Sequence, residues 1–298
     1  MTDRAVTAPR SLPVDRIHAV RRAKRRARTL LKHFLLALCA LTMLYPVLWM
    51  VVSSLRPKSE IFRTPGLVLT DLRVENYVNG WNAYAEPFGH YMINSVIVVI
   101  GAILGNLVAC SMAAYAFARL EFRAKRVWFA VMLITIMLPI HVIIVPQYVL
   151  FSELDWVNTF LPLIVPKFLA TDAFFIFLMV QFIRGIPREL DEAARIDGAG
   201  HARIFLDIIL PLMVPALATT AIFTFIWTWN DFYSQLIYLT DPDMYTTPLA
   251  LRAFVDQQTE TDWGSVFAMS VVSIIPVFLV FLAGQRFLLR GIATTGGK

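Results

Sequence analysis

The sequence predicts an all-α polytopic membrane protein with six transmembrane helices. Of its 298 residues, 58% are hydrophobic and 16% are charged, whereas soluble domains are about 45–50% apolar and 25% charged. The apolar residues are gathered into long runs, and a run of about 20 residues is the length that a helix needs to cross a hydrocarbon core. A chain of this length can form two soluble domains, but this distribution favours a bundle of membrane-spanning helices.

The N-terminal segment, residues 1–32, is polar and rich in arginine. We expect it to be a cytoplasmic basic tail, solvated and partly disordered, that holds the first span to anionic lipid. Nucleic-acid binding is the less favoured interpretation of such a tail. The apolar run 33–55 predicts the first span. It is too long for the core of a cleaved signal peptide and lacks a small-residue cleavage site.

Three more spans are predicted at 91–117, 127–151 and 160–183. The second span carries a stripe of small residues at every fourth position, which suits close helix packing. The stripe consists of Gly101, Gly105, Ala109 and Ala113. The third span contains Pro139 and Pro146, which interrupt the backbone ladder and need partners within the protein.

The fifth and sixth spans are predicted at 212–239 and 264–288. Residues 33–290 therefore form one transmembrane domain, and residues 291–298 form a short tail, expected to be cytoplasmic. Neither Cys39 nor Cys110 implies a disulfide framework or a metal site, because both lie in apolar runs.

The distribution of Lys and Arg predicts the orientation of the six spans. Ten of these residues lie in 1–32, four each in 118–126 and 184–211, and three in 286–298. The connections on the opposite side, 56–90 and 240–263, hold five together. Since cytoplasmic loops carry the excess of positive charge, both termini and the connection 184–211 are expected in the cytoplasm.

The connection 184–211 is the longest charged interruption in the apolar second half of the chain. Pro187 suits the first position of a helix, and Gly198 suits the left-handed residue that ends one. The stretch predicts a helix of about ten residues, a glycine turn and a second short helix from about 202 to 210, which Pro211 and Pro215 close. The predicted i,i+4 pairs on the first helix are Arg188–Glu192 and Asp191–Arg195.

This stretch resembles the signature loop of bacterial ABC importer permeases. The matching residues are Glu192-Ala193-Ala194, Asp197-Gly198-Ala199, Phe205, Ile208 and Leu210-Pro211. Further matches to the maltose-transporter-type branch, and within it to the six-span partner, extend over about 33–290. They include Ala114-Tyr115-Ala116-Phe117-Ala118-Arg119, Pro146-Gln147-Tyr148 and Trp229-Asn230-Asp231-Phe232. The arginine-rich tail lies outside this resemblance.

The resemblance implies a type I ABC importer permease fold and a set of partners. These are a second homologous permease chain, two ATPase subunits and an extracytoplasmic solute-binding protein, all at a bacterial cytoplasmic (inner) membrane. It implies that the loop 184–211 docks on an ATPase subunit. The implied docking residues are Glu192, Ala193, Ala194, Asp197, Gly198 and Ala199.

No glycine-rich phosphate loop of the Walker type is present in the sequence. The chain is therefore expected to be no enzyme and to hold no cofactor or metal, with ATP and Mg bound by the partner ATPase. We find neither clustered metal-ligating residues nor a nucleophile motif of a membrane enzyme.

Candidate residues of the solute pathway lie within the fourth and fifth spans. Ionisable residues inside a membrane are costly and often functional, which singles out Asp172; capping of a helix and pairing with another chain are its alternative roles. Lys167, five residues away, is expected to lie too far round the helix to pair well. The other candidates are Phe175, Trp229, Asn230 and Asp231.

The resemblance implies import of a sugar, either a di- or oligosaccharide, or of a related polyol. The alternative is a secondary transporter coupled to protons or sodium. That mechanism needs a relay of carboxylates within the membrane, for which Asp172 and Asp231 are the candidates, and it leaves the loop 184–211 without a role.

Overall fold

The structure is a computed structural model that describes residues 14–63, 66–69, 71–256 and 261–293. Every regular element in these ranges is helical, as the sequence predicts. Four helical stretches are long and apolar enough to cross a membrane, and the number rises to six if each of two bent helix pairs counts as one span.

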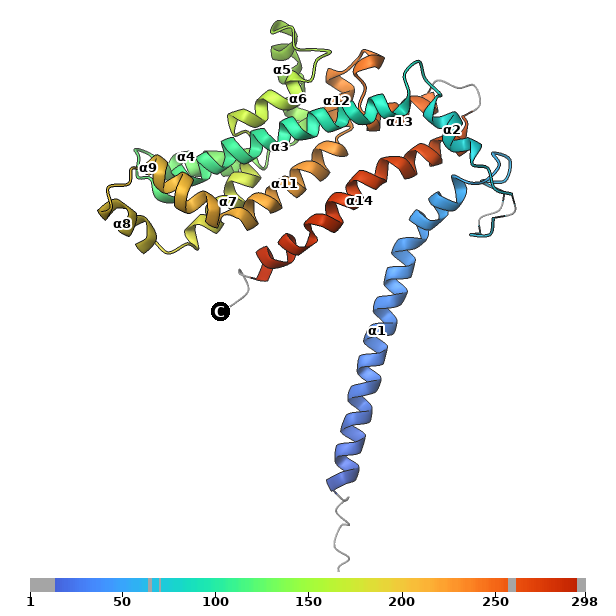
Figure 1. Cartoon of the computed structure of the whole chain (residues 1–298), viewed down its shortest axis with the longest axis horizontal. Coiled ribbons are helices and arrows are strands. Elements are labelled where there is room, and N and C mark those ends of the chain that lie inside the picture. Colours follow the sequence, from blue (N-terminus) through green and yellow to red (C-terminus); the bar gives the residue numbers. More distant parts are fainter. Residues whose placement is uncertain (1–13, 64–65, 70, 257–260, 294–298) are drawn as a thin grey trace, which may run out of the picture.

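The first helix, α1, runs from Val14 to Ser53 without interruption and extends away from the other helices (Figure 1). Its apolar part, Lys24–Ser53, is the first candidate span, and none of the window tested is buried within this chain. The prediction of a partly disordered tail over 1–32 is wrong for the described residues 14–32, which continue the helix of the span. Residues 1–13 lie outside the described residues.

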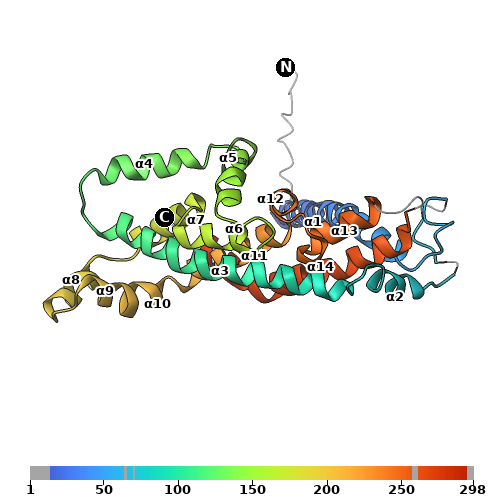
Figure 2. The same ribbon diagram turned by 90° about the horizontal axis from the view of Figure 1, so that it is seen from above.

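The remaining helices form an elongated bundle (Figures 1 and 2). They are α2 Glu75–Trp81, α3 Phe88–Arg119, α4 Lys125–Thr135, α5 Ile140–Glu153, α6 Leu161–Ile164, η1 Val165–Leu169, α7 Ala173–Arg184, α8 Glu189–Ile196, α9 His201–Arg203, η2 Ile204–Ile209, α10 Leu210–Leu212, α11 Val214–Trp229, α12 Tyr233–Tyr238, η3 Pro242–Met244, α13 Thr247–Asp256 and α14 Trp263–Ala293.

The helix α3 lies at the centre of the bundle, where it packs against α7, α11 and η1. Two glycines of the predicted small-residue stripe allow its close approach to the fourth span. A Cβ atom at Gly105 would lie 2.8 Å from the Cβ atom of Lys167, and one at Gly101 would lie 2.8 Å from the side chain of Ile164. This part of the stripe therefore has the packing role that the sequence predicts.

The third, fourth and fifth spans are interrupted, and the sequence predicted an interruption only in the third, at Pro139 and Pro146. The third consists of α4 and α5, which are bent by 100° where Pro139 precedes α5. The fourth breaks after η1 because Ala170 adopts a left-handed backbone with φ 55°. The fifth ends as a continuous helix at Trp229, and α12 continues after a short break.

Candidate functional site

The predicted helix–turn–helix of the connection 184–211 is present. The helix α8 begins at Glu189 rather than at Pro187 and ends at Ile196. Gly198 has φ 83°, as predicted for a residue that ends a helix. The N–H of Gly198 donates to the carbonyl of Arg195 (3.0 Å) and that of Ala199 donates to Ala194 (2.9 Å), so the helix ends in a Schellman motif.

The second helix of this loop is longer than predicted and extends from His201 to Leu212. Its middle part, η2, is a π-helix, a form that is frequent at functional sites. Pro211 does not close this helix, contrary to the prediction. It lies at the start of α10, and the chain bends by 74° between Leu212 and Val214.

One face of α8 is exposed and includes apolar surface. Glu192, Ala193, Asp197 and Gly198 are exposed, while Ala194 and Ala199 are half-buried against the main hydrophobic core. Ile196, which sequence reasoning missed, is 88% exposed. An exposed isoleucine three residues from the exposed Ala193 is a surface that a partner can cover.

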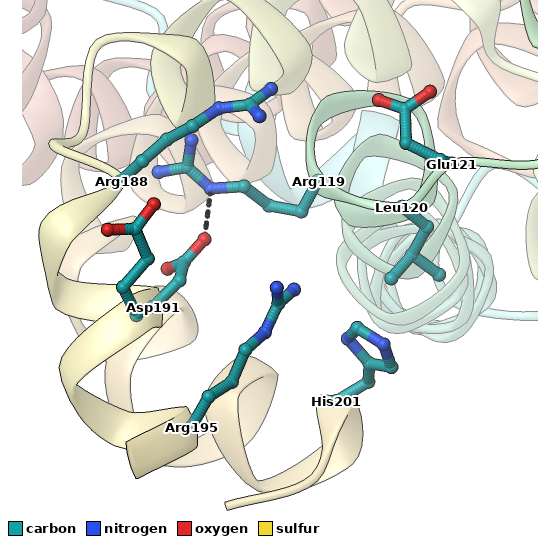
Figure 3. Close-up of a pocket in the computed structure, with 8 residues that line it drawn as sticks. Arg119, Leu120, Glu121, Arg188, Asp191, Arg195 and His201 are labelled. Carbon is teal, nitrogen blue, oxygen red and sulfur yellow. Dashed lines mark ion pairs between the residues drawn. The ribbon is translucent and has the colours of Figure 1, made fainter.

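The opposite face of α8 is fixed to the end of α3 by a buried ion pair. The Nε atom of Arg119 lies 2.9 Å from Oδ2 of Asp191, and the two side chains are 3% and 8% exposed (Figure 3). The predicted i,i+4 pairs are wrong: among the described ion pairs, Asp191 is paired with Arg119 and not with Arg195, and Arg188 is not paired with Glu192.

The ion pair borders a pocket of about 340 Å³. Its lining is almost entirely charged and comes from the end of α3 and from both helices of the loop (Figure 3). The lining residues are Arg119, Leu120, Glu121, Arg188, Asp191, Glu192, Arg195 and His201. Glu192 is the one predicted docking residue among them.

A second polar cluster lies at the break in the fourth span. Lys167 Nζ lies 2.9 Å from Oδ2 of Asp172, so the expectation that Lys167 lies too far round the helix to pair well is wrong. It assumed a continuous helix, whereas the left-handed Ala170 turns the chain between them. Asn106 of α3 donates to Asp172 Oδ2 (2.6 Å) and to Thr224 Oγ1 of α11 (3.1 Å). The cluster thus joins four elements.

Asp172 also lines a cavity with a volume of about 810 Å³. The cavity lies among α3, α4, α5, α7 and α11. Its wall is mainly apolar and aromatic and includes Phe117, Trp128, Phe174 and Trp227, with Gln147 and Thr171 as polar groups. This composition is typical of small-molecule sites.

The other predicted solute residues do not line this cavity. Phe175 is fully buried, and its ring centroid lies 5.1 Å from that of Trp227. Trp229 is buried and donates from Nε1 to the carbonyl of Ser273 (3.1 Å). Asn230 and Asp231 form hydrogen bonds with the backbone of their own segment, with Ile226 and Ser234 respectively.

No group of three or more His, Cys, Asp or Glu side chains that could hold a metal ion occurs within the described ranges. The charged clusters of the site are ion pairs, not ligand sets. The fold and the site define a multi-pass membrane protein with a helical loop exposed outside the apolar bundle.

The chain belongs to the family of binding-protein-dependent transport system inner membrane components, whose model matches residues 105–294. It is therefore a permease subunit of an ABC transporter in the inner membrane.

Individual relatives match over most of the chain. The diacetylchitobiose uptake system permease protein of Streptomyces coelicolor is 35% identical over 86% of this chain and 84% of its own length. The arabinooligosaccharides transport system permease protein of Halalkalibacterium halodurans is 32% identical over 88% and 94%. The sn-glycerol-3-phosphate transport system permease protein of Escherichia coli is 31% identical over 89% and 95%.

Proposed function

We propose that this permease subunit forms half of the translocation pathway of an importer for a sugar, either a di- or oligosaccharide, or for a related polyol. Two similar proteins are named for oligosaccharide solutes and a third for a phosphorylated polyol, which supports this class. A second homologous permease chain forms the other half, two ATPase subunits bind below, and an extracytoplasmic solute-binding protein delivers the solute.

The ATPase binds the exposed face of α8, through Glu192, Ala193, Ala194 and the turn Asp197–Ala199. The observation that carries this proposal is the exposure of Ile196 and of Ala193, three residues before it, on a short helix whose other face is fixed to α3. Small residues permit close approach, and the isoleucine provides apolar area that a partner would bury. ATP and Mg are bound by the ATPase, and this chain does no chemistry.

Uptake by whole cells tests the docking role. We expect Gly198→Asp and Glu192→Lys each to abolish uptake while the protein remains in the membrane at normal abundance. A Cβ atom at Gly198 has no neighbour within 4 Å, so a side chain there does not disturb packing within this chain. Normal uptake by either variant at wild-type abundance contradicts the docking assignment.

The solute passes beside Asp172 and the aromatic wall of the 810 Å³ cavity. Sugar rings present C–H faces that stack on aromatic side chains and hydroxyls that need polar partners, and this wall offers both. Phe175 supports the wall from behind Trp227, while Trp229, Asn230 and Asp231 shape the break between α11 and α12.

An ion-coupled secondary transporter is the alternative. The contacts of the two candidate carboxylates favour the ABC mechanism, because Asp172 is neutralised by Lys167 and Asp231 accepts a backbone hydrogen bond. In membrane vesicles we expect uptake to require ATP and to be inhibited by vanadate. Uptake that persists with vanadate and collapses with an uncoupler supports the alternative.

Both termini and the loop 184–211 face the cytoplasm in this proposal. Single cysteines at Ile196 and in the connection 240–263 can be tested with a membrane-impermeant thiol reagent on intact cells. The reagent is expected to label the connection and not position 196. Labelling of position 196 from outside contradicts the orientation and the docking role together.

A further inference from the structure

The last turn of α3 is attached to both helices of the docking loop. Arg119, the final residue of α3, pairs with Asp191 in the first turn of α8. Tyr115, one turn earlier, packs on Phe205 of η2 with ring centroids 5.1 Å apart. Arg119 also makes a third contact: its Nη2 donates to the carbonyl of Ile186 (2.7 Å), which lies just before α8.

Each charge of the ion pair lies at the helix end that favours it. A cation is stabilised at a helix C-terminus and an anion in the first turn of a helix, so the C-terminus of α3 meets the N-terminus of α8 through matched charges. Oδ1 of Asp191 and Nε of Arg119 are both buried, and neither has a hydrogen-bond partner, so the two groups are held by charge attraction without hydrogen-bond geometry. The carboxylate therefore depends on Arg119 for charge compensation.

The helix α3 continues from this joint to the polar cluster beside the cavity. Asn106, which donates to Asp172, lies thirteen residues before Arg119 in the same uninterrupted helix, a distance of about 20 Å at 1.5 Å per residue. Because α3 is uninterrupted over this distance, a displacement of Arg119 along the helix axis also moves Asn106.

We propose that Arg119 and Asp191 are positioning residues that make α8 and α3 move together, so that movement of the docking helix by the ATPase reaches Asp172 and the cavity through α3. This inference rests on the proposed docking function and adds the route by which movement enters the bundle. Buried ion pairs with one defined geometry suit this role because breaking them leaves an uncompensated charge.

The test uses the complete transporter, reconstituted in liposomes with its ATPase and binding protein, and measures ATP hydrolysis and solute uptake in the same vesicles. In Asp191→Asn, which keeps the shape of the side chain, we expect the ATPase to remain bound and active. Uptake per ATP hydrolysed is expected to fall about tenfold, within the usual range of coupling between sites. The double variant Arg119→Asp with Asp191→Arg should recover part of this ratio.

Glu121→Gln is the matched control, because Glu121 lies in the same pocket lining and, among the described ion pairs, pairs with Lys125 at the start of α4 (3.1 Å) and not with α8. Its ratio of uptake to hydrolysis should equal that of the wild type.

The inference is overturned if Asp191→Asn keeps the wild-type ratio while total activity falls with abundance, since the pair is then purely structural. It is also overturned if Asp191→Asn loses ATPase binding and the swapped pair restores neither binding nor uptake. Failure of the docking proposal looks different: uptake then survives Gly198→Asp.

Discussion

Gly198 is the residue of the docking loop where a single methyl group gives the sharpest test. Its φ of 83° lies in the left-handed region, and a Cβ atom there has no neighbour within 4 Å. Gly200 lies two residues further on and is equally open, but its φ is −76° and its ψ is 169°. The substitutions Gly198→Ala and Gly200→Ala therefore add the same atom to the same loop, and only the first requires a strained backbone.

The size of the expected effect on ATPase binding depends on the backbone conformation alone, because an added Cβ atom has no close neighbour at either position. An L-residue in the left-handed conformation costs roughly 1–2 kcal/mol, which corresponds to a factor of about 5–30 in population. If the turn seen here is the one that the ATPase binds, the apparent dissociation constant rises by at most that factor. Gly200→Ala is expected to leave it unchanged.

Binding of the purified ATPase to the permease pair in nanodiscs measures this constant directly, and thermal unfolding of the same samples reports whether the bundle is intact. We expect weaker ATPase binding for Gly198→Ala alone, with its unfolding temperature lowered by at most about the few degrees that 1–2 kcal/mol of backbone strain causes. Equal affinities for the two variants would show that the left-handed turn is not needed for docking, and the reasoning would fail.

Three further outcomes are expected. Asp172→Asn leaves Lys167 without its partner at a site about a quarter exposed, so the loss of stability should be smaller than the 3–5 kcal/mol of a fully buried pair, about 1–3 kcal/mol by thermal unfolding in detergent. Gly105→Val should force α3 away from Lys167, whose Cβ would lie 2.8 Å from the new Cβ, and lower the unfolding temperature more than Asp172→Asn does. Trp227→Ala should reduce solute uptake without changing ATPase binding, because Trp227 lines the cavity far along the chain from α8; unchanged uptake would argue against this solute route.

The long apolar helix α3 and the end of α8 before Gly198 could be predicted from the sequence because each has a local cause. A long apolar run requires a helix in a membrane, and a glycine after a polar helix marks its end. The breaks depend on less local causes. Pro139 was visible as a break, but the left-handed Ala170 has no signal in its residue type, and the resulting contact between Lys167 and Asp172 could not be anticipated.

The partner of Asp191 in the docking loop also could not be predicted from local sequence rules. The i,i+4 rule assigned Asp191 to Arg195 of its own helix, but such exposed pairs contribute only about 0.2–0.5 kcal/mol. The buried pair with Arg119 forms instead, and Arg119 is the last residue of α3, far from Asp191 in the sequence. One signal was available: Ile196 interrupts an otherwise polar helix surface, and its 88% exposure marks the face directed away from the bundle.

The sequence of α3 explains how this helix contacts both polar clusters. Gly101 and Gly105 let α6 and η1 approach α3 closely, and Asn106, the next residue, donates a hydrogen bond to Asp172, the partner of Lys167. Arg119 then ends the helix at the docking loop. The helix α3 is thus attached to the Asp172 cluster through Asn106 and to the docking loop through Arg119. When α3 shifts together with one of these clusters, the contacts of the other cluster must change.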